Sequence, residues 1–513
     1  MNFTNMKKSV TLGGRINLND FVAVSRFHAE LLFSEDYCRR VGENRKVVEQ
    51  WIAENKVMYG VTTGFGSLCN KVISPEEAGQ LQHNIIASHS TSVGEPFTEE
   101  QARAVMLMVL QNLGQGYSGV RLELLEKYRE FLNKGVTPWA PREGSVGYLS
   151  PEAHMARVVE GDGKAYYQGE LLDAAEALRR AGIEPLKLAS KEGLALVSGT
   201  TSVTALAVLA LYDMLKAALS ADVIGAFSFE ACGGQLDAFC EEVMSVRPHP
   251  EQGTTAKNLR SILKDSAMLK EAQGEHLQDC LSLRCIPQLH GAAKKTLYDA
   301  LRTIETEMNA CCDNPIIWKS ETRSTAISAC NPDSSYVGIE MDSACIAATN
   351  LAKISERRSN HLIDESLSGY PCFMVKNPGL NSGLMITQYT QAGLLNEMRV
   401  LSTSATIDNT PTCCNQEDYV AMGYNAAKKA VTIAERLEYI LAMELLDVYE
   451  TLGFQKSTAP RGSATRTVFD EIAKTVPQME DDMFLHPHIE TLRDLIHSGR
   501  LVQLVQGCVG ALE

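Results

Sequence analysis

The most apolar stretch of this chain reads VTALAVLALYDMLKA, from Val203 to Ala217. It is shorter than the roughly 20 apolar residues that cross a bilayer, and it already contains Asp213 and Lys216. Its spacing and its alanine and leucine content are typical of a helix. We therefore expect a helix that is buried in the core of a folded protein.

Helix-period patterns extend over much of the sequence on both sides of that stretch. They cover residues 102–113, 122–132, 203–240, 345–367 and 418–449. Strand-like sequence is confined to roughly the first 30 residues and to patches at 57–61 and 316–318. The fold class is therefore predicted to be mainly α, with long helices packed in an extended bundle, often across subunits.

The length of 513 residues allows more than one domain. Glycine-rich, polar segments at 60–70, 141–151 and 198–202 precede the longest helices, and such loops commonly carry active-site residues. We predict an N-terminal domain with active-site loops over residues 1–210. A central and C-terminal long-helix bundle would follow over residues 211–513.

The charge balance and the cysteines limit the possible partners and the compartment. With 48 Lys+Arg against 63 Asp+Glu, the formal charge is -15, which disfavours binding to nucleic acid or to anionic membranes. The 14 cysteines include adjacent pairs but no C-x-x-C spacing for a metal, and no apolar leader follows the first lysines. We expect reduced thiols in a cytoplasmic protein.

A series of motifs begins at Tyr59, where the chain reads YGVTTGFG. The later blocks are LQHN with SH (81–84, 88–89), GYSGVR (116–121), KEGLAL (191–196), QD with SLRC (278–279, 282–285), DNP (313–315), SERR (355–358), NPGLNSG (377–383) and NQED (415–418). In this order the blocks resemble the histidine and phenylalanine ammonia-lyases over nearly the whole chain. The resemblance implies a long-helix bundle of the ammonia-lyase/fumarase type and a homotetramer with active sites shared between subunits.

The sequence departs from that family between Gly147 and Pro151. The family pattern places Ala-Ser-Gly after Gly-Ser-Val-Gly, and this triad cyclises into the methylidene-imidazolone electrophile that activates the substrate. Here GSVG (144–147) runs directly into Tyr148, Leu149, Ser150 and Pro151. Because Tyr148 also replaces the aspartate that follows the triad, we interpret the departure as a true deletion. The alternative is a cross-linked triad omitted from the written sequence.

Three catalytic residues are carried over from the resemblance. Tyr59 matches the tyrosine that is proposed to take the proton from Cβ, and Arg284 matches the arginine that binds the substrate carboxylate through a planar fork. Glu417 matches the glutamate near the substrate ring or amine. Core packing, a structural salt bridge and helix capping are the respective alternatives.

Four substrate-binding residues are predicted on weaker grounds. His89 occupies the position that contacts the imidazole ring in the histidine enzymes, and Gln278 could bind the carboxylate or the ring. Ser198 stands where the family has an asparagine, and Lys376 could pair with a thiolate-like sulfur on the ring. An interior histidine, a surface amide and a solvated lysine are the ordinary alternatives.

A permanently charged leaving group would not need the missing electrophile. One branch of the superfamily, the ergothionases, lacks the triad and eliminates trimethylamine from ergothioneine to give thiourocanate. We therefore predict such a carbon–nitrogen lyase, which acts on a small betaine and uses no metal or organic cofactor. The alternatives are a histidine-type ammonia-lyase or aminomutase and a catalytically inactive homologue.

Overall fold

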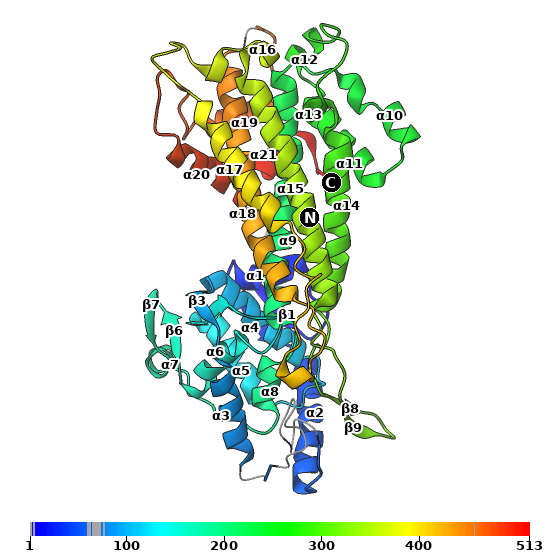
Figure 1. Cartoon of the computed structure of the whole chain (residues 1–513), viewed down its shortest axis with the longest axis vertical. Coiled ribbons are helices and arrows are strands. Elements are labelled where there is room, and N and C mark those ends of the chain that lie inside the picture. The colour runs from blue at the N-terminus through cyan, green and yellow to red at the C-terminus, as the bar shows by residue number, and fades with distance from the viewer. Residues whose placement is uncertain (1–2, 4–5, 59–62, 64–72, 75–76, 456) are drawn as a thin grey trace.

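The computed structural model describes residues 3, 6–58, 63, 73–74, 77–455 and 457–513. Five long helices form its centre: α9 (Thr201–Ala231), α14 (Ile286–Glu307), α15 (Ser335–Ile363), α17 (Met385–Leu401) and α18 (Gly423–Gly453). Figure 1 shows them side by side in an elongated bundle, with the N-terminal elements gathered around one of its ends. The predicted mainly α fold is confirmed.

The N-terminal region is built from short helices and small sheets. Its elements are β1 (Ser9–Leu12), α1 (Leu18–Ser25), β2 (Glu30–Phe33), α2 (Glu35–Ala53), α3 (Ala78–His89), β3 (Val93–Pro96), α4 (Glu99–Leu113), α5 (Leu122–Lys134), β4 (Val136–Pro138), β5 (Pro141–Glu143), α6 (Glu152–Arg157), β6 (Lys164–Tyr167), β7 (Glu170–Asp173), α7 (Ala174–Ala181) and α8 (Glu192–Val197). β1 pairs in parallel with β2, whereas β3 with β5 and the order β4-β6-β7 are antiparallel. Thus α1 interrupts the N-terminal residues that we expected to be strand-like.

Shorter elements cover the bundle. They are α10 (Glu241–Val246), α11 (Pro250–Leu263), α12 (Ala267–Glu271), α13 (Leu281–Arg284), the hairpin of β8 (Ile316–Lys319) and β9 (Ser324–Ile327), α16 (Glu365–Ser368), α19 (Ser463–Ile472), α20 (His486–His497) and α21 (Arg500–Val509). The hairpin β8–β9 confirms the strand predicted at 316–318. In Figure 1, α12, α13 and α16 lie at the end of the bundle that is remote from the N-terminal region.

Side-chain contacts fix the directions of the long helices. Glu444 of α18 accepts hydrogen bonds from Ser228 of α9 (2.6 Å) and from Arg358 of α15 (Nη2, 2.8 Å), all close to the C-terminal ends of these helices. Helix α14 runs the other way, because Glu307 at its C-terminal end accepts from Thr200 just before α9 (2.6 Å). Helices α9, α15 and α18 are therefore parallel, and their N-terminal ends share one end of the bundle.

Helix α9 is the core helix that the sequence predicted. Every one of its residues except Asp213 is buried, and the apolar window of the segment from Glu192 to Ala231 has a mean hydropathy of 1.9 and lies wholly inside the protein. The helix ends at Ala231 rather than near residue 240, because Gly233 adopts a left-handed φ of 65°. Residue 210 lies within α9, so the helix connects the two predicted domains, and the boundary itself stays a prediction.

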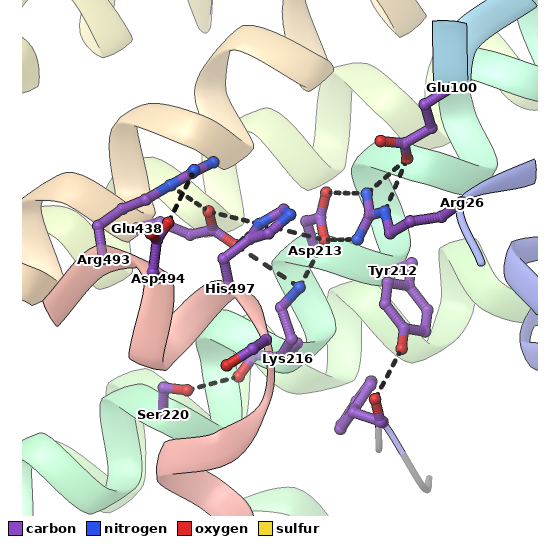
Figure 2. Close-up of polar contacts among 12 residues, drawn as sticks. Arg26, Glu100, Tyr212, Asp213, Lys216, Ser220, Glu438, Arg493, Asp494 and His497 are labelled. Carbon is purple, nitrogen blue, oxygen red and sulfur yellow. Dashed lines mark hydrogen bonds and ion pairs between the residues drawn. The ribbon is translucent and has the colours of Figure 1, made fainter. Parts of the chain in front are cut away.

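Asp213 and Lys216 of α9 belong to an ion-pair network (Figure 2). Asp213 contacts Arg26 and Lys216, each at 2.7 Å, and Glu438 of α18 contacts His497 of α20 at 2.9 Å. Asp213, Glu438 and His497 converge as metal ligands would, but the Lys216 ammonium lies 2.7 Å from Asp213 and 3.7 Å from Glu438. The network is therefore a set of ion pairs that ties α20 to the core.

Candidate active site

Three predicted site residues and Tyr148 lie at the N-terminal ends of α9, α15 and α18. Ser198 lies just before α9, and Tyr148 lies in the loop between β5 and α6. His89 ends α3, and Glu417 precedes α18. The loops join tightly here, because a Cβ on Gly147 would lie 2.8 Å from Ser334 Oγ, and one on Gly423 would lie 2.3 Å from the same atom.

Glu417 is held in a tight turn that brings its carboxylate to Tyr148. The turn is closed by the amide of Thr412, which donates to the carbonyl of Glu417 (2.9 Å). Glu417 Oε2 accepts hydrogen bonds from Thr412 Oγ1 (2.7 Å) and from Tyr148 Oη (3.2 Å). Burial and the Glu417 carboxylate raise the pKa of Tyr148 well above its usual value, so this phenol keeps its proton and donates it.

The chain between Gly147 and Pro151 does not fit the family's electrophile. Methylidene-imidazolone forms from Ala-Ser-Gly, whereas Tyr148, Leu149 and Ser150 occupy this segment. The Leu149 amide donates to the carbonyl of Val197 (2.8 Å), and the Ser150 amide donates to the carbonyl of Tyr148 (3.0 Å). The segment is a turn, with Leu149 at a left-handed φ of 73°, that places a half-buried tyrosine beside Glu417.

Ser198 is buried beneath the site and fixes the segment that follows α14. Its Oγ accepts a hydrogen bond from the Asn314 amide (3.1 Å). The adjacent Asp313 forms a fully buried ion pair with Lys191 at 2.7 Å. Gly199 has a φ of 113°, and a Cβ there would lie 2.9 Å from Asn112 Nδ2, so glycine is needed at this position. Ser198 is therefore anchored from both sides.

His89 completes this end of the site as a neutral imidazole. Its Nδ1 lies 3.0 Å from Ser88 Oγ, and its side chain is half-buried. Burial lowers the pKa of His89, and this effect outweighs the opposing influence of Glu417. At neutral pH the ring is thus uncharged and can exchange hydrogen bonds with a heteroaromatic substrate.

The other predicted residues lie at the far end of the bundle. Arg284 closes α13, and its Nε donates to the carbonyl of Asp279 (3.0 Å). Gln278 is exposed in the segment just before α13. Lys376 is exposed between α16 and α17, where its ammonium pairs with Glu480 at 2.5 Å. This end also holds the contact between the Gln235 amide and Asp279 Oδ2 (2.7 Å), just beyond the end of α9.

One chain therefore does not bring Arg284 to Glu417. Ser198 lies immediately before α9, and Asp279 is bonded just after its end, so the 31 residues of α9 separate the two groups. At the usual rise per residue, that helix is about 45 Å long. Tyr59, the predicted base, lies outside the described residues.

The sequence analysis did not select Tyr148 as a site residue. It is brought to Glu417 by a turn and a contact across 269 positions, which a sequence pattern does not reveal. The available signal was its place in the sequence, where it directly follows Gly147 and replaces the family's aspartate. The replacement of that aspartate, directly beside the missing triad, could have marked Tyr148 as a candidate site residue.

Comparison with known proteins agrees with this architecture. The family model described as aromatic amino acid lyase matches residues 16–474. Histidine ammonia-lyase of Streptococcus sanguinis is 40% identical over 502 residues, which cover 97% of each chain. The crystal structure of histidine ammonia-lyase from Trypanosoma cruzi superposes with a TM-score of 0.91 at 33% identity and covers 98% of this chain and 96% of that one.

A further structural neighbour is the ergothionase of Treponema denticola, solved in complex with desmethyl-ergothioneine sulfonic acid. It has a TM-score of 0.88 and 26% identity and covers 96% of this chain and 99% of its own. The chain belongs to the aromatic amino acid lyase family, which confirms the resemblance to the ammonia-lyases. It is accordingly an enzyme of the carbon–nitrogen lyase class.

Proposed function

We propose that this enzyme eliminates trimethylamine from ergothioneine to give thiourocanate, without a methylidene-imidazolone group. The observation that carries the proposal is the turn from Gly147 to Pro151, in which Tyr148, Leu149 and Ser150 stand where the electrophile's precursor residues belong. An aromatic amino acid lyase with this turn needs a substrate whose nitrogen leaves unaided. The structural likeness to an ergothionase supports the same choice.

The chemistry of the leaving group explains why a betaine fits. Expulsion of ammonia requires a protonated amine, which can lose its proton to the active-site base before Cβ does. A trimethylammonium has no such proton and departs as neutral trimethylamine. When the Cβ proton is removed, the heteroaromatic ring delocalises the negative charge, and the N-terminal ends of α9, α15 and α18 contribute partial positive charge nearby.

In the proposed mechanism Tyr59 removes the Cβ proton, as the resemblance implies, and Arg284 binds the substrate carboxylate through its planar fork. Glu417 lies beside the ammonium, while His89 and Ser198 line the same end of the pocket. Gln278 and Lys376 lie at the same end of the bundle as Arg284. In this mechanism Gln278 binds the carboxylate or the ring, and Lys376 pairs with the ring sulfur. We place the reaction in the cytoplasm, in keeping with the free thiols of the described cysteines.

Because the length of α9 separates Arg284 from Glu417, we propose that different subunits supply the two ends of the substrate site. We propose a homotetramer in which Arg284 of one chain faces Glu417 of another. Large apolar side chains are exposed on the neighbouring helices α15 and α17, where a second copy of the chain could cover them. They are Tyr336, Ile339 and Ile346 on α15, and Ile386, Tyr389 and Val400 on α17.

Incubation with ergothioneine tests the reaction directly. We expect release of trimethylamine and a conjugated product that absorbs in the ultraviolet, with histidine and unmethylated thiohistidine left essentially unchanged. Borohydride and cyanide, which poison the family's electrophile, should not inactivate the enzyme. Ammonia release from histidine at a comparable rate, or inactivation by borohydride, would instead support a histidine-type ammonia-lyase, the reading favoured by the 40% identity to those enzymes.

Two further measurements address the remaining alternatives. Mass spectrometry of the peptide from Gly144 to Met155 should give the mass of the unmodified sequence, whereas a cross-linked triad would add to it. Tyr59→Phe should lower turnover by about a hundredfold or more, as loss of a positioned base does. A wild-type protein that turns over neither substrate would correspond to an inactive homologue.

A further inference from the structure

We propose that Tyr148 is the residue that selects a quaternary ammonium over a primary one, by forming the aromatic wall of a cation site whose charge partner is Glu417. This inference rests on the proposed function, since it concerns the nitrogen end of the same substrate. It goes further by assigning the selectivity to one side chain and to a cation–π contact. Four features of the described residues support this role of Tyr148.

The first feature is that the Glu417 carboxylate has no lysine or arginine partner among the described residues of its own chain. Within the described residues, its carboxylate accepts hydrogen bonds from the hydroxyls of Thr412 and Tyr148, and no lysine or arginine forms an ion pair with it. His89 is the nearby titratable base, and burial lowers its pKa, so it stays neutral. A half-buried carboxylate in this situation is stabilised by a ligand cation.

A second acidic group strengthens the same field. Asp333 acts electrostatically on Tyr148 together with Glu417 and thereby contributes to the raised pKa of this phenol. The described residues provide no salt-bridge partner for Asp333, whose Oδ1 instead accepts from the Ser335 amide (3.1 Å). Two carboxylates, those of Glu417 and Asp333, thus act on Tyr148, and such a pair suits a positively charged ligand group.

The third feature is the position of the Tyr148 ring. Its hydroxyl lies 3.2 Å from Glu417 Oε2, so a cation bound by this carboxylate can come within the range of about 6 Å over which an aromatic face attracts cations. The backbone beside it is held, because the amide of Leu149 donates to the carbonyl of Val197. Gly147 on the other side is packed against Ser334. The turn thus fixes an aromatic wall next to the carboxylate.

The fourth feature is that the Tyr148 ring offers no hydrogen-bond acceptors for an ammonium group. An ammonium group needs hydrogen-bond acceptors on several sides, but the Tyr148 hydroxyl donates its proton to Glu417. The aromatic ring provides a face that attracts positive charge without requiring a hydrogen bond, which suits N-methyl groups. The aspartate found here in the family pattern would instead accept hydrogen bonds. The replacement of aspartate by Tyr148 therefore matches a change from an ammonium to a trimethylammonium substrate.

Competition by simple ligands measures the site apart from turnover. Choline and tetramethylammonium should bind the wild-type enzyme, as measured by calorimetry and as competitive inhibition. The neutral isostere 3,3-dimethylbutanol and methylammonium should bind far more weakly. Equal binding of choline and its neutral isostere, or no binding of either cation, would overturn the proposal without any variant.

Variants then assign the effect to the ring. Tyr148→Leu should weaken tetramethylammonium binding about tenfold and raise KM for ergothioneine in parallel. Tyr148→Phe keeps the ring and should keep tetramethylammonium binding, and Tyr166→Leu, a half-buried tyrosine of β6, serves as the matched control. If Tyr148→Leu does not fold, the comparison of Tyr148→Phe with Tyr148→Trp replaces it, because both must bind tetramethylammonium.

The outcomes separate this inference from the proposed function. Trimethylamine release with unchanged tetramethylammonium affinity in Tyr148→Leu would leave the function standing and overturn the role of Tyr148. Tetramethylammonium binding that depends on the ring, in an enzyme that does not release trimethylamine, would support the cation site and overturn ergothioneine as the substrate.

Discussion

Lys191 and Asp313 form an ion pair of 2.7 Å in which both side chains are fully buried. Lys191 immediately precedes α8 in a left-handed conformation, with a φ of 75°, and the next residue after Asp313 is Asn314, whose amide donates to Ser198. The pair therefore connects α8 to the segment after α14 beneath the candidate active site.

Removal of one partner of this pair should strongly destabilise the enzyme. Lys191→Met leaves the Asp313 carboxylate buried without its counter-charge, which typically costs about 3–5 kcal/mol. The apparent midpoint of thermal unfolding should fall clearly, and Asp313→Asn added to Lys191→Met should restore part of the loss. Lys295→Met, which breaks the exposed pair with Asp299, is the control and should have no measurable effect. Equal midpoints for Lys191→Met and the control would contradict the prediction.

Arg284→Lys should raise KM for the substrate and lower kcat/KM. A single ammonium does not reproduce the two-pronged contact that a guanidinium makes with a carboxylate. Steady-state kinetics with ergothioneine measure the effect, and circular dichroism checks that the variant is folded. Arg260 of α11, whose guanidinium donates to the Phe239 carbonyl, offers a matched control as Arg260→Lys. Unchanged kinetics in Arg284→Lys would assign Arg284 a structural role.

The stability of the enzyme should decrease as the pH rises to about 7. Asp447 and Glu450 of α18 are buried, and burial raises the pKa of each to about 7. In the folded protein both pKa values lie above those that the same groups have in the unfolded chain. The protonated groups therefore contribute their full stability below the pKa values of the unfolded chain. This stability is lost as the pH rises to the pKa values of the folded protein. Between the unfolded pKa values and about pH 7, each group should cost up to about 1.4 kcal/mol per pH unit, and the loss should level off at higher pH.

Thermal unfolding from pH 5 to pH 8.5 tests this pH dependence. The unfolding midpoint of the wild type should fall from pH 5 to about pH 7 and then level off, and the double variant Asp447→Asn, Glu450→Gln should have a flatter profile. Glu480→Gln, which changes an exposed carboxylate at the same end of the bundle, should follow the wild type. A wild-type midpoint that rises between pH 6 and pH 8 would be the opposite result.

Cys280 should be the first described cysteine to react with iodoacetamide at pH 7.5. Burial raises the pKa of its thiol, but hydrogen bonds from His361 (3.7 Å) and Ser282 (3.2 Å) outweigh this effect and lower the pKa to about 7. Cys330 is also exposed, but burial raises its pKa, so it is the natural comparison. Peptide mass spectrometry should show faster labelling at Cys280, and His361→Ala should slow it. Equal rates at the two cysteines would contradict the assignment.

The long helices could be predicted from the sequence because their apolar periodicity is local. The ends of these helices could not be predicted in the same way. The periodic pattern extends from 203 to 240, but α9 ends at Ala231, close to the left-handed φ of Gly233. Likewise α15 begins ten residues before the expected 345, at Ser335, because Ser334 packs against Gly147 and Gly423. Helix ends are set by contacts between distant segments, which periodicity does not contain.

The site could be predicted only in part. The motifs pointed to His89, Ser198 and Glu417, and the structure brings these together at one end of the bundle. The motifs did not reveal that Arg284 lies at the opposite end, because that follows from the length and direction of α9. Nor does the sequence around Lys376 indicate its contact with Glu480, a residue 104 positions away.

Arg284 and Glu417 are separated by the length of α9. If the site is shared between subunits, as proposed, this separation predicts how two inactive variants behave in combination. Arg284→Ala and Glu417→Ala should each be inactive alone. The two variant proteins can be unfolded together and reassembled, or expressed in one cell. Some sites will then combine the intact Glu417 of the Arg284→Ala chain with the intact Arg284 of the Glu417→Ala chain. Two dead alleles should thus complement each other, which a pocket formed by a single chain would not permit.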